Sequence, residues 1–200
     1  AEILAIAPYF PEYRPFAEAA GLRFRAVAPD IPDFPIRLDA VAAALTPDTA
    51  AILVNSPNNP SGTVYTRETL EALAALLTQK AAEFGHPIYL IADEPYRELV
   101  YGVTAPFIPL LYADTVVCYS YAKSLSLPGE RIGYVYVSER AADSRKLYAA
   151  VAGAARAMGH VCAPSLMQHV IARCAHLRPD LAAYDRNRRA LYDGRTPMGY

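Results

Sequence analysis

A single lysine lies in a segment rich in hydroxyl side chains, with an arginine shortly after it. Lys123 follows an apolar stretch, has Ser120, Ser124 and Ser126 around it, and is followed in the same segment by Arg131. A lysine forms an imine with an aldehyde only from its neutral amine, which desolvation or a nearby positive charge favours. Arg131 can supply that charge, or it can hold a phosphate with its planar guanidinium. The segment therefore predicts a site for a compound that carries both an aldehyde and a phosphate.

Two further polar segments also begin where an apolar stretch stops. Residues 55–62 follow the apolar run 50–54, and Asp93 and Tyr96 follow the run 88–92. Open α/β sheets bind their ligands at the carboxyl ends of the strands, and Lys123 has the same position after the run 115–119. Each segment alone also fits an ordinary turn, a helix cap, core packing or a solvated loop. Together, in this order, they indicate one site at one edge of a sheet.

The side chains in these segments match the functional groups of pyridoxal 5'-phosphate, which has both an aldehyde and a phosphate. A carboxylate at Asp93 would keep a pyridine nitrogen protonated, so that the ring accepts electrons from a carbanion at a substrate's α-carbon. Asn59 and Tyr96 can donate hydrogen bonds to a phenolic oxygen and so stabilise its anionic form. The residues therefore predict pyridoxal 5'-phosphate as the cofactor.

Three strings of the sequence carry a family resemblance. NNPSG, DEPY and SYAKSLSLPGERIGY resemble, in this order and with fitting separations, the class I/II aminotransferases, the fold type I pyridoxal-phosphate enzymes related to aspartate aminotransferase. The resemblance implies that Lys123 forms the Schiff base with the cofactor and that Asp93 pairs with the pyridinium nitrogen. It makes Lys123, Asp93 and Tyr96 the catalytic residues.

The resemblance also implies how the rest of the cofactor is held. Asn59 and Tyr96 would contact the 3'-oxygen of the ring, and Ser120 and Arg131 would bind the phosphate. The segment PYFPEY near the start is similar to the family segment whose aromatic side chain stacks on the pyridine, which makes Phe10 the candidate for that role. The predicted cofactor-binding set is Lys123, Asn59, Asp93, Tyr96, Ser120, Arg131 and Phe10.

The activity implied by the resemblance is transfer of an amino group between an amino acid and a 2-oxo acid, with Lys123 as the base at the α-carbon. Two alternatives stay open. One is another reaction of fold type I enzymes, such as that of a C–S lyase, decarboxylase or racemase, because these share Lys123, Asp93 and Arg131. The other is a non-catalytic regulator domain that binds the cofactor. The resemblance further implies a homodimer in the full-length protein.

The chain is shorter than members of that family. They have an amino-terminal part with a glycine-rich phosphate-binding turn, and a carboxyl-terminal small domain whose arginine binds the substrate's α-carboxylate. We therefore expect residues 1–200 to form one domain, most of the large cofactor-binding domain, with the amino-terminal segment and the small domain outside this sequence. The fragment alone is expected to be inactive.

Composition favours a soluble domain with a substantial core. The chain has 54% hydrophobic and 20% charged residues and a net charge of −1, which gives no bias toward nucleic acid. No apolar run is long enough to predict a membrane span, and no signal peptide is indicated. Cys118, Cys162 and Cys174 lack metal-ligand spacing, so no metal is expected. The cytoplasm is the expected location.

Strand-like and helix-like stretches alternate along the chain. Such alternation predicts an α/β fold with three layers, α/β/α, and a mostly parallel sheet. A helix over 67–84 has Thr66 as its N-cap and ends at Gly85. Only a short turn separates Lys123 from the last strand, which permits one antiparallel strand. Strands are predicted at 3–7, 24–28, 50–54, 88–92, 115–119 and 132–137, and further helices at 141–158, 163–175 and 179–192, the last with a charged face interpreted as solvated.

Overall fold

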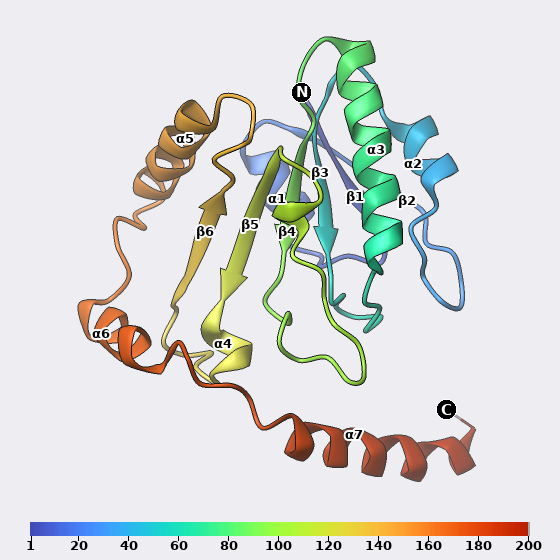
Figure 1. Ribbon diagram of the computed structural model, residues 1–200, viewed down its shortest axis with the longest axis vertical. Coiled ribbons are helices and arrows are strands. Elements are labelled where there is room, and N and C mark those ends of the chain that lie inside the picture. Colours follow the sequence, from blue (N-terminus) through green and yellow to red (C-terminus); the bar gives the residue numbers. More distant parts are fainter. Residues whose placement is uncertain (200) are drawn as a thin grey trace.

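Six strands form one sheet at the centre of the molecule, in the order β2-β1-β3-β4-β5-β6 (Figure 1). The computed structural model describes residues 1–199. All neighbouring strands are parallel except β5 and β6, which are antiparallel. The mostly parallel sheet with one antiparallel strand is therefore confirmed. The strands are β1 Glu2–Ile6, β2 Arg23–Val27, β3 Thr49–Asn55, β4 Tyr89–Asp93, β5 Thr115–Ser120 and β6 Gly133–Val137.

Helices connect the strands and continue after the last one. The predicted start and end of the longest helix are confirmed: the Thr66 hydroxyl accepts a hydrogen bond from the Thr69 backbone N–H at 3.2 Å, and Gly85 has a left-handed φ of 76°. Three helices follow β6, as expected. The helices are α1 Tyr13–Ala19, α2 Leu38–Ala44, α3 Arg67–Phe84, α4 Tyr121–Ser124, α5 Ser144–Ala157, α6 Ser165–Cys174 and α7 Leu181–Arg195.

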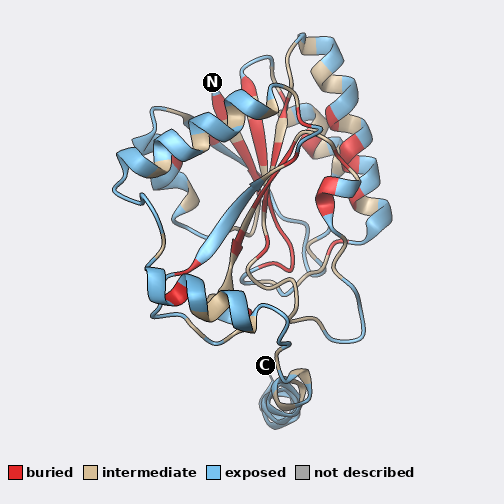
Figure 2. Cartoon of the chain, turned by 60° about the vertical axis from the view of Figure 1, so that its left-hand side comes forward, coloured by how far each residue is buried: buried red, intermediate tan, exposed pale blue. Residues whose placement is uncertain are grey.

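The core lies mainly between α2, α3 and one face of the sheet. Leu4 of β1 packs there with α3 residues such as Leu73 and Leu77. Because successive strand residues point to opposite faces, Ala5 packs on the other face, where it meets Ala17 of α1. Helices therefore cover both faces, which agrees with the expected three layers. Figure 2 shows the contrast between the buried strands in the centre and the exposed β6 in front.

The position of β6 is set by a glycine. A Cβ at Gly133 would lie 2.2 Å from the Tyr119 carbonyl oxygen, so only glycine permits this approach. Gly133 pairs with Ser120, the last residue of β5. The tight pairing brings the residues just before β6 next to the segment that carries Lys123. Within residues 1–199, no helix has both the length and the apolar character needed to cross a bilayer.

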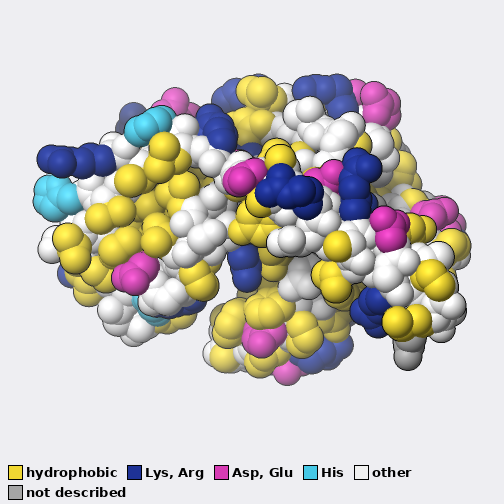
Figure 3. Space-filling model, turned by 90° about the horizontal axis from the view of Figure 1, so that it is seen from below, with side chains coloured by type: hydrophobic (Ala, Val, Ile, Leu, Met, Phe, Trp, Pro, Cys, Tyr) yellow, Lys and Arg dark blue, Asp and Glu magenta, His cyan; other side chains and the backbone are white. Residues whose placement is uncertain are grey.

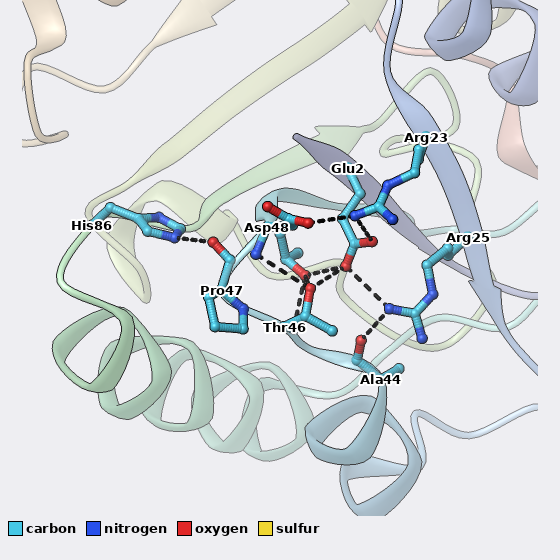
Figure 4. Close-up of polar contacts among 9 residues, drawn as sticks. Glu2, Arg23, Arg25, Ala44, Thr46, Pro47, Asp48 and His86 are labelled. Atoms are coloured by element: carbon cyan, nitrogen blue, oxygen red, sulfur yellow. Dashed lines mark hydrogen bonds and ion pairs between the residues drawn. The ribbon is translucent and has the colours of Figure 1, made fainter.

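A cluster of polar side chains lies at the edge of the sheet where β1, β2 and β3 begin (Figure 4). Its centre is Glu2, whose side chain is about 1% exposed. The hydroxyl groups of Thr46 and Thr49 each donate a hydrogen bond to Glu2 Oε1 at 2.7 Å. Arg25 donates to the same oxygen at 3.1 Å, and Arg23 lies 3.5 Å from Oε2. This buried carboxylate is thus fully partnered.

Candidate active site

The polar segments predicted to form a site do lie at one edge of the sheet. Asn55, Asp93 and Ser120 are the last residues of β3, β4 and β5, which are adjacent and parallel. Asn55 and Asp93 are partners in the register of β3 and β4. In Figure 1 these strands end at the lower side of the sheet, opposite the cluster around Glu2.

Asp93 is held by a tyrosine from a distant part of the chain. The Tyr13 phenol donates a hydrogen bond to Asp93 Oδ2. Burial raises the pKa of Asp93, and the hydrogen bond from Tyr13 acts in the opposite direction. Burial and the adjacent Asp93 charge raise the pKa of Tyr13, so this phenol keeps its proton and remains a donor. A desolvated carboxylate of this kind favours a cationic partner.

Tyr13 was not among the residues selected from the sequence. It lies in the same segment as Phe10, and its ring meets the Phe10 ring edge to face at a centroid distance of 5.7 Å. Phe10 is 39% exposed, and its contact with Tyr13 places it one residue away from Asp93. The repeated aromatic residue in PYFPEY was the signal that could have identified Tyr13.

Asn55 connects the turn after β3 to the end of β4. Its side-chain Nδ2 donates to the Asp93 carbonyl oxygen at 2.9 Å, and its Oδ1 accepts from the Asn59 backbone N–H at 2.7 Å. A carboxamide can do both because it carries a donor and an acceptor. Asn55 thereby fixes Asn59 relative to Asp93. The sequence pattern included Asn55 but did not indicate this function.

Asn59 and Tyr96 line one cavity of about 580 Å³, within the usual size range of small-molecule sites. The Lys123 Nζ atom lies 5.8 Å from the centroid of the Tyr96 ring. The structure therefore brings together Asn59, Tyr96 and Lys123 from three separate segments. The other residues that line the cavity are Pro57, Asn58, Pro60, Gly62, Val64, Leu99, Val100, Tyr101, Val103 and Arg188.

Arg188 of α7 is the charged side chain on the wall of this cavity. Its guanidinium lies 5.1 Å from the centroid of the Tyr101 ring and is bonded to Asp185 at 2.5 Å. The predicted solvated charged face of this helix therefore applies only in part, since Arg188 docks on the loop after β4. Seen from below (Figure 3), acidic and basic side chains are interspersed over the middle and right of this side, and hydrophobic side chains gather at the left.

Lys123 lies in a short helix rather than in an irregular turn. The Ser120 hydroxyl accepts a hydrogen bond from the Ala122 backbone N–H at 3.2 Å and so caps α4. Because this cap forms, residues that sequence analysis placed in a turn take up a helical conformation. Lys123 is exposed, whereas its neighbour Ser124 is buried.

Arg131 is placed apart from the cavity that Asn59 and Tyr96 share. It is exposed, has a left-handed φ of 50°, and donates from Nη1 to the Pro128 carbonyl oxygen at 3.0 Å. Arg131 borders a second cavity, which includes Cys118, Tyr134 and His160. The structure thus links Phe10 to Asp93 through Tyr13 and places Lys123 beside Tyr96, which lines the cavity with Asn59, but it leaves Arg131 on a different cavity.

The donors at this edge fit pyridoxal 5'-phosphate. A partly buried carboxylate whose pKa is raised by desolvation, Asp93, is suited to a ring nitrogen that carries a proton. Asn59 and Tyr96 line one cavity, as donors to a single ring oxygen would have to. The amine of Lys123 lies beside the Tyr96 ring. The acid thus comes from β4, the lysine from α4, the amide from the turn after β3 and the phenol from the segment after β4.

Comparison with known proteins agrees with this geometry. A family model for aminotransferase class I and II matches residues 1–196. A probable aspartate/prephenate aminotransferase from Thermus aquaticus is 37% identical over 140 residues, which cover 66% of this chain and 34% of that protein. An aspartate aminotransferase from Geobacillus stearothermophilus is 33% identical over 139 residues, with the same coverage.

Solved structures resemble the whole chain. A crystal structure of an amino transferase from Eubacterium rectale has a TM-score of 0.95 and 54% identity, and the match covers 100% of this chain and 50% of that one. An aspartate aminotransferase from Thermotoga maritima has a TM-score of 0.84 and 26% identity, with coverage of 99% and 51%. The chain thus spans about a third of the curated relatives and about half of the solved chains. The chain belongs to the class I and II aminotransferase family.

Proposed function

We propose that the full-length protein is a pyridoxal-phosphate-dependent aminotransferase, which moves an amino group between an amino acid and a 2-oxo acid. The observation that carries this proposal is the assembly of Asp93, Lys123, Tyr96 and Asn59 at the carboxyl edge of the sheet. Family membership supports the same reaction class. When bound, the cofactor supplies an electron-accepting ring next to the amino carbon of the substrate.

The residues of this chain have distinct roles in the proposal. Lys123 holds the cofactor through its amine and, once released, moves a proton from the substrate's α-carbon. Asp93 keeps the ring nitrogen protonated, while Asn59 and Tyr96 donate hydrogen bonds to the ring's 3'-oxygen.

The phosphate and the ring face are assigned to the remaining residues. Ser120 and Arg131 hold the phosphate, and Phe10 stacks on the ring. For Arg131 this requires its guanidinium to leave the Pro128 carbonyl, which is feasible because the side chain is exposed. Phe10 has the support of its contact with Tyr13, the partner of Asp93.

We further propose that the chain is the greater part of the large, cofactor-binding domain of a longer cytoplasmic protein that forms a homodimer. Its coverage of about half of the solved relatives supports the domain assignment. The dimer rests on the family resemblance, and the location rests on the composition of the chain.

Borohydride reduction of the full-length protein tests the lysine. The chain has three lysines, Lys80, Lys123 and Lys146, and two of them pair with acids on helices away from the cavity, Lys80 with Glu83 and Lys146 with Asp143. Visible absorbance and a cofactor fixed to the peptide that contains Lys123 are expected. Cofactor fixed to Lys80 or Lys146 instead would overturn the assignment.

The reaction class is tested by screening amino donors against 2-oxo acid acceptors. We expect the amino group to appear on the acceptor. Release of ammonia without transfer would favour a lyase, and cofactor binding without turnover of any amino acid would favour a regulator domain.

A further inference from the structure

Tyr119 is a buried residue of β5 whose hydroxyl meets two polar side chains from different segments. Its side chain is 8% exposed. The hydroxyl donates to Glu98 Oε2 at 2.8 Å and lies 2.8 Å from Ser124 Oγ. The sequence pattern included Ser124 as a hydroxyl beside Lys123 but indicated no function for it, and it did not select Tyr119 or Glu98.

The direction of the hydrogen bonds follows from counting protons. A carboxylate only accepts, and a phenol has a single proton, so Tyr119 donates to Glu98 and Ser124 must donate to the Tyr119 oxygen. Burial raises the pKa of Tyr119, which keeps that proton in place. The three side chains thus form a hydrogen-bond network in which Ser124 donates to Tyr119 and Tyr119 donates to Glu98.

One end of this hydrogen-bond network lies on the helix that carries the proposed cofactor lysine. Helix α4 has four residues, Tyr121–Ser124, and a single turn of helix is not stable by itself. Its amino end is capped by the Ser120 hydroxyl. At its other end Ser124, the neighbour of Lys123, is buried and bonded to Tyr119. Two hydroxyl contacts therefore hold the turn at both ends.

The other end of the hydrogen-bond network, Glu98, lies on the segment after β4. Glu98 follows Tyr96 closely in the sequence, and Tyr96 is the aromatic ring beside Lys123 Nζ. Tyr119 is therefore hydrogen-bonded to both segments, the one that carries Lys123 and the one that carries Tyr96, whose side chains lie beside each other. Loss of its hydroxyl would loosen Lys123 relative to Tyr96.

We propose that Tyr119 is a positioning residue, which holds Lys123 at the distance from Tyr96 that cofactor attachment requires. The proposal rests on the proposed function of Lys123. Tyr119 acts through Ser124 and Glu98 and does not touch the cofactor.

The test compares two buried tyrosines in the full-length protein. Tyr119→Phe removes the hydroxyl and keeps the ring. Tyr112→Phe is the matched control, because Tyr112 is 5% exposed and its hydroxyl donates to the Ile88 carbonyl at 2.8 Å, away from the predicted site. Both variants should lower the melting temperature to a similar extent. Only Tyr119→Phe should speed cofactor loss on dilution, by roughly five- to tenfold for one hydrogen bond, and shift the midpoint of the pH titration of visible absorbance.

A second variant keeps the test valid if Tyr119→Phe does not fold. Ser124→Ala should also speed cofactor loss. The double variant should add little to either single change, because both substitutions break the same hydrogen-bond network. Equal cofactor retention in the wild type, Tyr119→Phe and Ser124→Ala, with Lys123 labelled in all, would overturn this inference alone. Failure to label Lys123 in the wild type would instead overturn the proposed function, and with it this inference.

Discussion

Two carboxylates, Glu2 fully buried and Asp93 partly buried, lie at opposite edges of the same sheet and have opposite surroundings. Glu2 begins β1, and Asp93 ends β4. Burial acts to raise the pKa of Glu2, but the hydroxyls of Thr46 and Thr49 and the Arg25 guanidinium together hold it below its usual value. Burial raises the pKa of Asp93, and the one side-chain hydrogen bond that it accepts, from Tyr13, does not compensate.

Glu94, the next residue, repeats the pattern of Asp93. Arg97 Nε donates to Glu94 Oε2 at 2.6 Å, but the buried Oε1 has no hydrogen-bond partner among the described residues. Burial raises the pKa of Glu94 despite the Arg97 charge. Carboxylates at the carboxyl edge are therefore short of partners, whereas Glu2 at the amino edge has a full set.

The difference separates stability from function. Removing a partner from a buried, fully paired charge destabilises the folded state, and a desolvated charge without partners costs free energy that a ligand can recover. We infer that the amino edge contributes mainly to stability, whereas at the carboxyl edge Asp93 is left short of partners, as binding of the proposed cofactor would require. Substitutions at the two edges should therefore affect different measurements.

The largest expected effect is on turnover. Asp93→Asn in the full-length protein should lower the rate of amino transfer roughly 10²- to 10³-fold, because the ring nitrogen loses its anionic partner. The melting temperature should stay the same or rise, since an amide costs less to bury than a carboxylate. Steady-state kinetics and thermal unfolding measure the two effects. Normal turnover in Asp93→Asn would contradict the functional role assigned to Asp93 at the carboxyl edge.

The next effect is on stability. Glu2→Gln should lower the free energy of unfolding by about 2 kcal/mol, because charged hydrogen bonds become neutral ones. Turnover per folded molecule should not change. Urea unfolding provides the measurement, with Arg67→Ala as the control: its bond to Glu71 at 3.3 Å is exposed, and its loss should cost under about 0.5 kcal/mol. Equal losses in the two variants would contradict the assigned role of Glu2.

The same stability difference should depend on pH. The folded-state pKa of Glu2 is lowered, so its contribution is fully present above the pKa of the unfolded chain and is lost as the pH falls through the folded value. The gap in unfolding free energy between the wild type and Glu2→Gln should therefore be widest near neutral pH and shrink in acid. A gap that widens in acid would show that folding raises the pKa of Glu2 instead of lowering it.

The smallest effect concerns Tyr13. Tyr13→Phe removes the donor to Asp93, so the pKa of Asp93 should rise further. Turnover should fall roughly five- to tenfold, as expected for one hydrogen bond, and the acid limb of the pH profile should move to higher pH. Phe16→Leu, an exposed change on the same helix, is the control. An unshifted acid limb in Tyr13→Phe would mean that Tyr13 does not tune Asp93.

Much of this molecule could be predicted from local sequence. Apolar runs predicted all six strands, and the capping residues Thr66 and Gly85 predicted the ends of α3, because hydrophobic pattern and cap chemistry act over a few residues. The same reasoning placed Asp93 and Lys123 directly after strands. Family resemblance then supplied a role for each, and these roles remain predictions.

Contacts between distant residues were decided only by the tertiary structure. The Tyr13–Asp93 pair spans 80 residues, and the Tyr119–Glu98 pair spans 21. Whether Arg131 faces the cavity of Asn59 and Tyr96 depends likewise on how the segment before β6 passes the end of β5. Sequence alone determined which groups are present and at which strand ends, because that information is local. Their partners depend on how helices and loops pack on the sheet, which no short stretch of sequence encodes.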